Sequence, residues 1–141
     1  MGMVSDDVFL MEELPRSILI VGGGYIACEM ACILSGLGVE VTQLYRGAQI
    51  LRGFDDEARG LVAEAMRARG IQLHTGSDVL MMGPPEASFD LPAGEAPVAA
   101  PPAGGPPRRG HVRVKSTQGL EGVFDALLWA TGRAPNTEGL G

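Results

Sequence analysis

Residues 18–27 have the sequence ILIVGGGYIA, and this stretch decides the fold. Its first four residues are a continuous apolar run rich in β-branched side chains, which is typical of a strand buried on both faces of a parallel sheet. Three glycines follow directly, and apolar residues then recur at helical spacing as far as Leu37. The stretch therefore predicts a strand, a tight turn and a helix in immediate succession.

The residues that follow extend this pattern. Residues 39–45 alternate as a second strand does, and residues 55–69 have acidic residues at their start and arginines at their end, as a helix dipole favours. Residues 71–75 supply a third strand. The order βαβαβ predicts an α/β fold with a Rossmann-like parallel sheet. We expect the buried face of the second helix to consist of Ala58, Leu61, Val62, Ala65 and Met66.

The C-terminal part departs from this alternation. Residues 84–107 contain eight of the ten prolines and are predicted to be an insertion loop. Residues 111–116 and 120–124 are expected to form an antiparallel hairpin or meander, and residues 126–130 a buried strand that rejoins the parallel sheet. We therefore assign residues 14–141 to one Rossmann-like domain.

Composition and charge exclude several classes of protein. The chain has 141 residues and a formal net charge of −6, so its overall charge does not favour nucleic acid or anionic membranes. It contains no apolar run of the roughly 20 residues that span a bilayer. Two cysteines provide no disulfide framework, which favours a reducing, cytoplasmic setting, or an organelle if a transit peptide precedes the chain.

The glycine turn fits the pattern G-x-G-x-x-G/A through Ala27. Gly22 permits the tight turn out of the strand, Gly24 lets the backbone approach a pyrophosphate, and Ala27 lets helix and strand pack closely. The N-terminus of the helix then stabilises phosphate through its free N–H groups. A purely structural glycine corner is the alternative, but the preceding strand and following helix favour a dinucleotide site.

The end of the second strand indicates which dinucleotide is bound. An NAD site has an acidic residue there, whereas this strand ends in Tyr45 and Arg46, with Arg52 in the same loop. Glu40 lies at the opposite end of the strand. Two guanidinium groups can bind a 2′-phosphate in bidentate fashion, so NADPH is the predicted cofactor. The alternative is that both arginines are solvated or pair with the acidic residues at 55 and 56.

Three ordered motifs carry a family resemblance: GGGYIACE at 22–29, YR at 45–46 with ILRGFD at 50–55, and ATGRAPNT at 130–137. Together they resemble the NADPH-binding domain of the glutathione reductases, within the FAD-dependent pyridine nucleotide-disulfide oxidoreductases. The resemblance covers residues 14–141 apart from the proline-rich insertion, and it implies that residues 1–13 are a linker from a flavin domain.

The resemblance implies roles for individual positions. Tyr25 corresponds to a tyrosine that covers the nicotinamide face of the flavin, and Glu29 to a glutamate near the nicotinamide carboxamide, both supporting hydride transfer. Without the resemblance, both would be interpreted as ordinary surface residues of the helix. The predicted cofactor-binding residues are Gly22, Gly23, Gly24, Tyr25, Ile26, Ala27, Glu29, Arg46, Arg52 and Gly132.

The same resemblance limits what this segment does alone. The flavin domain, its redox cysteine pair and the dimer domain with its catalytic histidine have no counterpart in these residues. We therefore expect the segment to bind NADPH without reducing glutathione disulfide by itself, while FAD is bound mainly by other domains of a homodimeric enzyme. Cys28 and Cys32 are interpreted as small core residues, and His74 and His111 as structural, with no metal site.

Three alternatives remain open from the sequence. The chain could be a stand-alone, non-catalytic dinucleotide-binding or redox-sensing module. It could instead belong to another disulfide reductase such as trypanothione reductase, because the substrate site lies in other domains. An NADH-linked relative such as dihydrolipoamide dehydrogenase is the third alternative, against which Arg46 and Arg52 argue.

Overall fold

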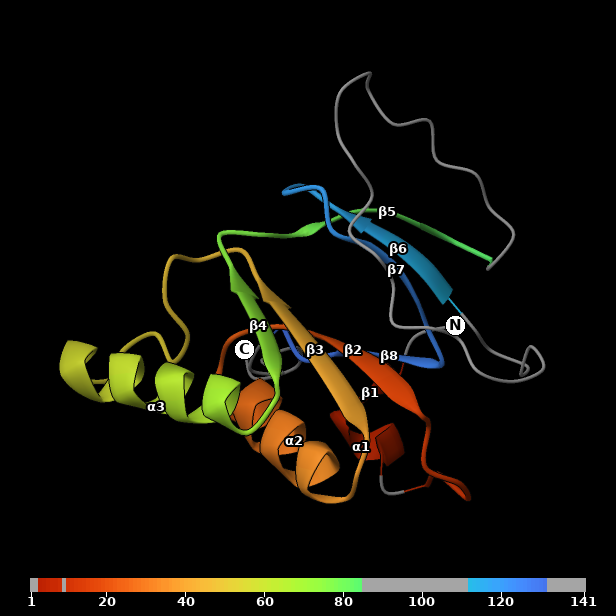
Figure 1. Ribbon diagram of the computed structural model, residues 1–141, viewed down its shortest axis with the longest axis horizontal. Coiled ribbons are helices and arrows are strands. Elements are labelled where there is room, and N and C mark those ends of the chain that lie inside the picture. The colour runs from red at the N-terminus through yellow and green to blue at the C-terminus, as the bar shows by residue number, and fades with distance from the viewer. Residues whose placement is uncertain (1–2, 9, 85–111, 132–141) are drawn as a thin grey trace, which may run out of the picture.

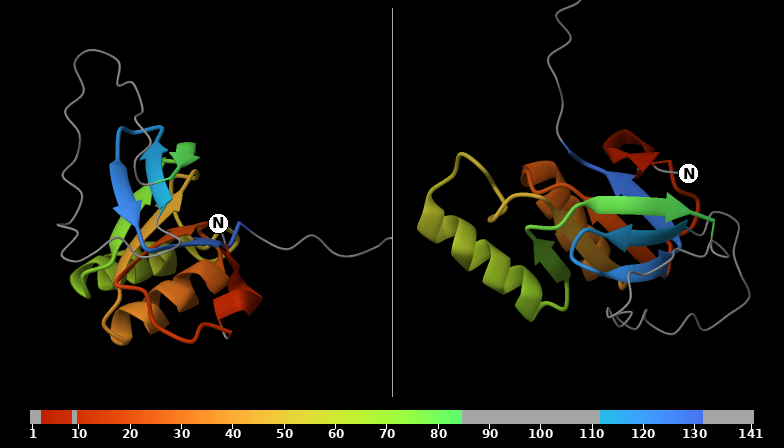
Figure 2. Two further views of the ribbon diagram at one scale, coloured as in Figure 1. Left: turned by 90° about the vertical axis from the view of Figure 1, so that its right-hand side faces the viewer. Right: turned by 90° about the horizontal axis from the view of Figure 1, so that it is seen from above.

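Two β-sheets and two long helices form three layers in this computed structural model, which describes residues 3–8, 10–84 and 112–131. The central layer is a five-stranded, wholly parallel sheet, with α2 and α3 on one face and a three-stranded antiparallel sheet on the other (Figures 1 and 2). The parallel strands in spatial order are β1 (Met3–Val4), β8 (Ala126–Trp129), β2 (Ser17–Val21), β3 (Glu40–Tyr45) and β4 (Gln72–Thr75).

The first strand, turn and helix confirm the prediction from residues 18–27. β2 is central in the sheet, and α2 (Tyr25–Gly36) begins directly after the glycines. Ile18 and Ile20 pack into the core under the helices, whereas Leu19 and Val21 pack into the core under the antiparallel sheet. A strand that is buried on both faces needs apolar residues at every position, which explains the unbroken run. The predicted α/β fold is confirmed.

The antiparallel sheet is larger than the sequence pattern indicates. The predicted hairpin is present as β6 (Val112–Ser116) and β7 (Glu121–Phe124). A further strand, β5 (Val79–Gly83), pairs with β6. The sequence does not predict this strand, because its apolar residues show no alternation with polar ones. Leu80, Met81 and Met82 are exposed in the structure. The sheet packs on the parallel sheet through Val112, Val114 and Phe124. The predicted insertion at 84–107 lies outside the described residues except for Pro84.

The N-terminal segment contains two short elements that the sequence pattern does not predict. β1 pairs in parallel with β8, with Met3 opposite Leu128, and α1 (Ser5–Val8) follows it. The expected linker therefore contributes an edge strand to the parallel sheet. Two residues are too few for a periodic pattern to be recognised, so only the pairing with β8 reveals this strand.

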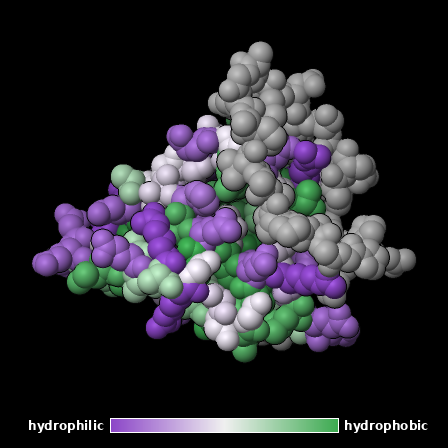
Figure 3. All heavy atoms as spheres, in the orientation of Figure 1, coloured by the Kyte–Doolittle hydropathy of each residue, from purple (hydrophilic) through white to green (hydrophobic). Residues whose placement is uncertain are grey.

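The predicted buried face of α3 (Asp56–Ala68) is wrong. Leu61 is 63% exposed and Val62 37% exposed, and of the five predicted residues only Met66 is buried. The face toward the protein is formed instead by Arg59, Gly60, Ala63 and Met66, which recur at helical spacing. The helix thus approaches the protein through small residues and one arginine, while larger apolar side chains remain at the surface. Figure 3 shows hydrophilic atoms over much of α3 with hydrophobic atoms along its lower edge.

The glycine turn lies very close to Ala130, the residue that directly follows β8. Gly22 has φ +141°, and a Cβ atom there would lie 2.0 Å from the carbonyl oxygen of Ala130. Gly24 differs, because its φ is −78° and no atom lies within 4 Å of an added Cβ.

No helix among the described residues is long and apolar enough to cross a membrane.

We expect Gly22→Ala to lower the free energy of unfolding by about 3 kcal/mol or more, because the methyl group meets a backbone carbonyl and the backbone conformation is strained. Gly24→Ala is the matched control and is expected to change stability by less than about 1 kcal/mol. Urea denaturation of the two variants and the wild type checks this. Equal stability of both variants would contradict the close contact at Gly22.

Candidate functional site

A cleft of about 770 Å³ opens where the central parallel strands end. β2, β3 and β8 are neighbours in register, with Val21 opposite both Leu44 and Trp129, so their carboxyl ends lie together. In open α/β sheets this edge is where ligands bind. The lining residues are Val21, Gly22, Gly23, Gly24, Leu44, Tyr45, Arg46, Gly47, Arg52, Asp78, Trp129 and Thr131.

The glycine turn offers backbone donors to this cleft. The N–H groups of Gly23 and Gly24 donate no hydrogen bond to any described residue. Gly24 is the N-cap of α2, no side chain caps this helix, and its first turn contains no acidic residue. An uncapped helix N-terminus beside free N–H groups is favourable for a phosphate. The open space at Gly24 agrees with the predicted close approach of a ligand.

Gly23 has a different role from its neighbour. A Cβ atom on Gly23 would lie 2.4 Å from Cγ of Tyr45, and one on Gly47 would lie 2.5 Å from Cε1 of the same ring. Both glycines therefore leave room for the Tyr45 ring, which forms part of the wall of the cleft. The sequence pattern assigns no function to Tyr45, although its position as the last residue of β3 marks it as a cleft residue.

The two predicted arginines lie together in the lining. Arg46 directly follows β3 and Arg52 lies in the loop before α3, and both are exposed. Neither forms a hydrogen bond or ion pair with any part of the chain that the structure describes. Asp78 is the acidic residue of the lining. The chain is acidic overall, but at this edge it presents two guanidinium groups that have no partner among the described residues.

The alternative in which these arginines pair with Asp55 and Asp56 is not observed. Asp55 caps α3 by accepting a hydrogen bond of 3.1 Å from the N–H of Ala58. Asp56 forms an ion pair of 3.0 Å with Arg59. Both carboxylates thus have partners on their own helix. The two arginines remain available for a ligand.

The remaining predicted residues are distributed differently. Tyr25 and Glu29 are exposed on α2, and neither they nor Ile26 and Ala27 line the cleft. Ala27 is fully buried in the core between helix and sheet, as its small size predicts. Gly132 lies outside the described residues. The structure therefore brings the glycines and both arginines together, while the roles of Tyr25 and Glu29 stay predictions.

A buried glutamine on β3 is hydrogen-bonded to the glycine turn. Gln43 on β3 is fully buried, and its Nε2 donates a hydrogen bond of 2.9 Å to the carbonyl of Gly22. The same atom lies 3.7 Å from Sγ of Cys28. Burial raises the pKa of the Cys28 thiol, Cys32 adds to the rise, and the hydrogen bond from Gln43 partly opposes it. Cys28 is therefore held as a neutral core thiol, which agrees with the interpretation from sequence.

This arrangement of parallel strands, glycine turn and uncapped helix is that of a Rossmann-like α/β fold. Comparison with known families extends this assignment, because residues 3–141 match the family of pyridine nucleotide-disulphide oxidoreductases. The chain belongs to this family.

Similar proteins agree with the family. The chain is 42% identical over 139 residues to a glutathione reductase of Burkholderia cepacia, covering 99% of this chain and 26% of that protein. It is 40% identical over 137 residues to the chloroplastic/mitochondrial glutathione reductase of Pisum sativum, covering 97% of this chain and 21% of that protein. The chain thus spans about a quarter of the length of these relatives.

Solved structures share the fold. The HOCl-induced flavoprotein disulfide reductase RclA from Escherichia coli is 25% identical with a TM-score of 0.71, over 96% of this chain and 26% of that one. LpdA from Mycobacterium tuberculosis is 22% identical with a TM-score of 0.70, over 99% of this chain and 25% of that one. The second likeness concerns the fold alone.

His74 lies on β4 opposite Leu44 and does not itself line the cleft. Its Nε2 is buried and has no hydrogen-bond partner among the described residues, and burial, with a smaller contribution from Arg67, lowers the pKa of His74 below the ordinary value of 6.5. In the described part of the chain no three His, Cys, Asp or Glu side chains gather as metal ligands. A neutral, structural imidazole fits these surroundings.

We expect the unfolding free energy to decrease as the pH falls from 7 through 6.5. Below this value the unfolded chain binds a proton at His74 that the folded chain, with its lowered pKa, does not bind. His74→Gln is expected to flatten this part of the curve. Denaturation of both proteins between pH 5.5 and 7.5 (about one unit on either side of an ordinary histidine pKa) checks it. Identical slopes would contradict the lowered pKa.

Proposed function

We propose that this chain is the NADPH-binding domain of a glutathione-reductase-like flavoprotein disulfide reductase. The single observation that carries the proposal is the pair of arginines, Arg46 and Arg52, that lie in the cleft at the end of β3 and bond to no described residue. A 2′-phosphate is a dianion with acceptor oxygens that guanidinium groups bind in bidentate fashion. NADH has no such group, and the arginines would then gain no partner from it.

The rest of the cleft fits a dinucleotide. Its volume of about 770 Å³ lies within the range of about 300–1,000 Å³ of typical small-molecule sites. The free N–H groups at Gly23 and Gly24 and the N-terminus of α2 would hold the pyrophosphate. The fully buried amide of Gln43 would keep the carbonyl of Gly22 turned away from the cleft.

In this proposal, the chain binds and orients the cofactor. NADPH would supply a hydride to a flavin, and the reduced flavin would serve a disulfide, through parts of a longer protein. Tyr25 is 59% exposed at the start of α2, where its ring is available to cover a flavin face. Glu29, one turn further along the same helix, would hydrogen-bond the nicotinamide carboxamide.

The names of the relatives support the assignment to a glutathione-reductase-like flavoprotein. The curated relatives at 42% and 40% identity are named glutathione reductases, and RclA is named a flavoprotein disulfide reductase. FAD, a second protomer and glutathione disulfide would then bind to the three quarters of such a protein that this chain does not cover. Trypanothione and other disulfides are alternative substrates, because in this proposal the disulfide binds to parts of the protein outside this chain.

Calorimetric titration of the chain with NADPH and NADH tests the proposal. We expect NADPH to bind more tightly by on the order of 100-fold, because two charge-assisted contacts distinguish the cofactors. Arg46→Ala is expected to reduce this preference by about tenfold or more. Arg69→Ala is the matched control, since Arg69 is an exposed arginine outside the cleft lining.

Equal affinities for the two cofactors in the wild type would remove the 2′-phosphate site and favour an NADH-linked relative. If the preference for NADPH persists unchanged in Arg46→Ala, Arg46 does not contribute to it. Equal losses in Arg46→Ala and Arg69→Ala would indicate a general effect of net charge rather than a contact.

A further inference from the structure

The loop between β3 and α3 carries both cleft arginines, and its backbone is irregular. Leu51, directly before Arg52, has φ +58°, the one positive φ of a residue other than glycine in the described part of the chain. A leucine in the left-handed region is strained and persists only where neighbouring groups hold it. The conformation of Arg52 therefore depends on what fixes residues 49–51.

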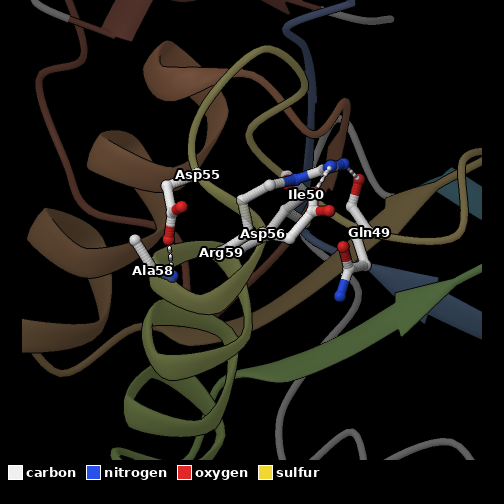
Figure 4. A network of polar contacts seen from close by, with 6 residues as sticks. All are labelled: Gln49, Ile50, Asp55, Asp56, Ala58 and Arg59. Carbon is white, nitrogen blue, oxygen red and sulfur yellow. Dashed lines mark hydrogen bonds and ion pairs between the residues drawn. The ribbon is translucent and has the colours of Figure 1, made fainter.

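Arg59 of α3 fixes this segment from one side (Figure 4). Its Nε donates to the carbonyl of Ile50 at 2.7 Å and its Nη2 to the carbonyl of Gln49 at 2.9 Å. Its Nη1 donates to Oδ1 of Asp56 at 3.0 Å. The side chain of Arg59 is only 16% exposed. A planar guanidinium with donors at fixed angles can bind two successive carbonyls at once, which a lysine cannot reproduce.

The glycine turn fixes the same segment from the other side. The N–H of Leu51 donates a hydrogen bond of 2.6 Å to the carbonyl of Gly23, and the side chain of Ile50 is 1% exposed. Residues 49–51 are thus held between α3 and the turn that lines the cleft. Arg52 follows at once, and its guanidinium bonds to no described residue.

We infer that Arg59 is a positioning residue that holds the backbone before Arg52, and thereby sets the preference of the cleft for a 2′-phosphorylated nucleotide. The inference rests on the proposed function and deepens it. A loop that is ordered before binding loses less conformational entropy when the ligand arrives, so the 2′-phosphate binds more tightly to a held Arg52. Arg59 forms an ion pair with Asp56, and replacing Arg59 also removes one positive charge, so a test in an Arg52→Ala background is needed to separate positioning from the change of charge.

Calorimetric titration with NADPH and NADH tests the inference in four proteins: the wild type, Arg59→Ala, Arg59→Lys and Arg67→Ala. We expect Arg59→Ala to weaken NADPH binding by about fivefold to tenfold and NADH binding by less than about twofold. Arg59→Lys should recover only part of this loss, because an ammonium group does not span both carbonyls. Arg67→Ala is the matched control, since Arg67 lies on the same helix and donates to the carbonyl of Leu73 instead.

A double-mutant cycle with Arg52→Ala identifies the route. In the Arg52→Ala background, Arg59→Ala should change the ratio of NADPH to NADH affinity by less than about twofold, because the group that it positions is gone. A thermal melt of each variant establishes that it is folded at the titration temperature. If Arg59→Ala does not fold, Arg59→Lys takes its place in the cycle.

Three results would overturn the inference: equal losses for both cofactors, a full additional loss in the Arg52→Ala background, or the same effect from Arg67→Ala. The wild type separates this failure from failure of the proposed function. A wild type with no NADPH preference rejects the proposed function, whereas a preference that is insensitive to Arg59→Ala rejects only the role of Arg59.

Discussion

The close approach of the glycine turn to the end of β8 is the constraint on which the site depends. There is no room for a methyl group between Gly22 and the carbonyl of Ala130, and the N–H of Ala130 donates to the carbonyl of Val21 at 2.8 Å. The chain leaving β2 must therefore turn tightly over its neighbour. This turn directs the N-terminus of α2, and the open space at Gly24, toward the cleft. A larger residue at Gly22 would move the helix and the donors that it presents.

The chemistry of the cleft follows from which charges have partners. The chain carries six more formal negative than positive charges, yet Asp55 and Asp56, the acidic residues that follow Arg52, are bound at the N-terminus of α3. Arg46 and Arg52 bond to no residue that the structure describes, so their donors are available to a ligand. Exposed guanidinium groups retain their hydration, so they carry no large desolvation penalty before binding, and a dianion can replace that water with charge-assisted hydrogen bonds.

Much of this could be predicted from sequence, because local patterns determine it. The buried run before Gly22, the helical spacing after it and the arginines after β3 need only near neighbours to be recognised. Besides the short N-terminal elements β1 and α1, three features needed the tertiary structure. β5 has exposed methionines and no alternation, α3 packs through Gly60 and Ala63 rather than through its larger apolar residues, and Arg59 binds carbonyls nine and ten residues away in a strained loop. The local sequence does not determine these features. The hydrogen bonds of Arg59, for example, depend on how the loop before α3 is placed against the helix.

The most direct test of the account is phosphorus NMR of NADP⁺ bound to the chain, in which the 2′-phosphate and the pyrophosphate give separate resonances. The free 2′-phosphate titrates near a pKa of about 6. If Arg46 and Arg52 bind its dianion, this pKa falls by about one unit or more in the complex. A 2′-phosphate that titrates as in the free nucleotide, while the pyrophosphate resonances shift, would contradict the account, because the glycine turn would then bind the dinucleotide without the arginines.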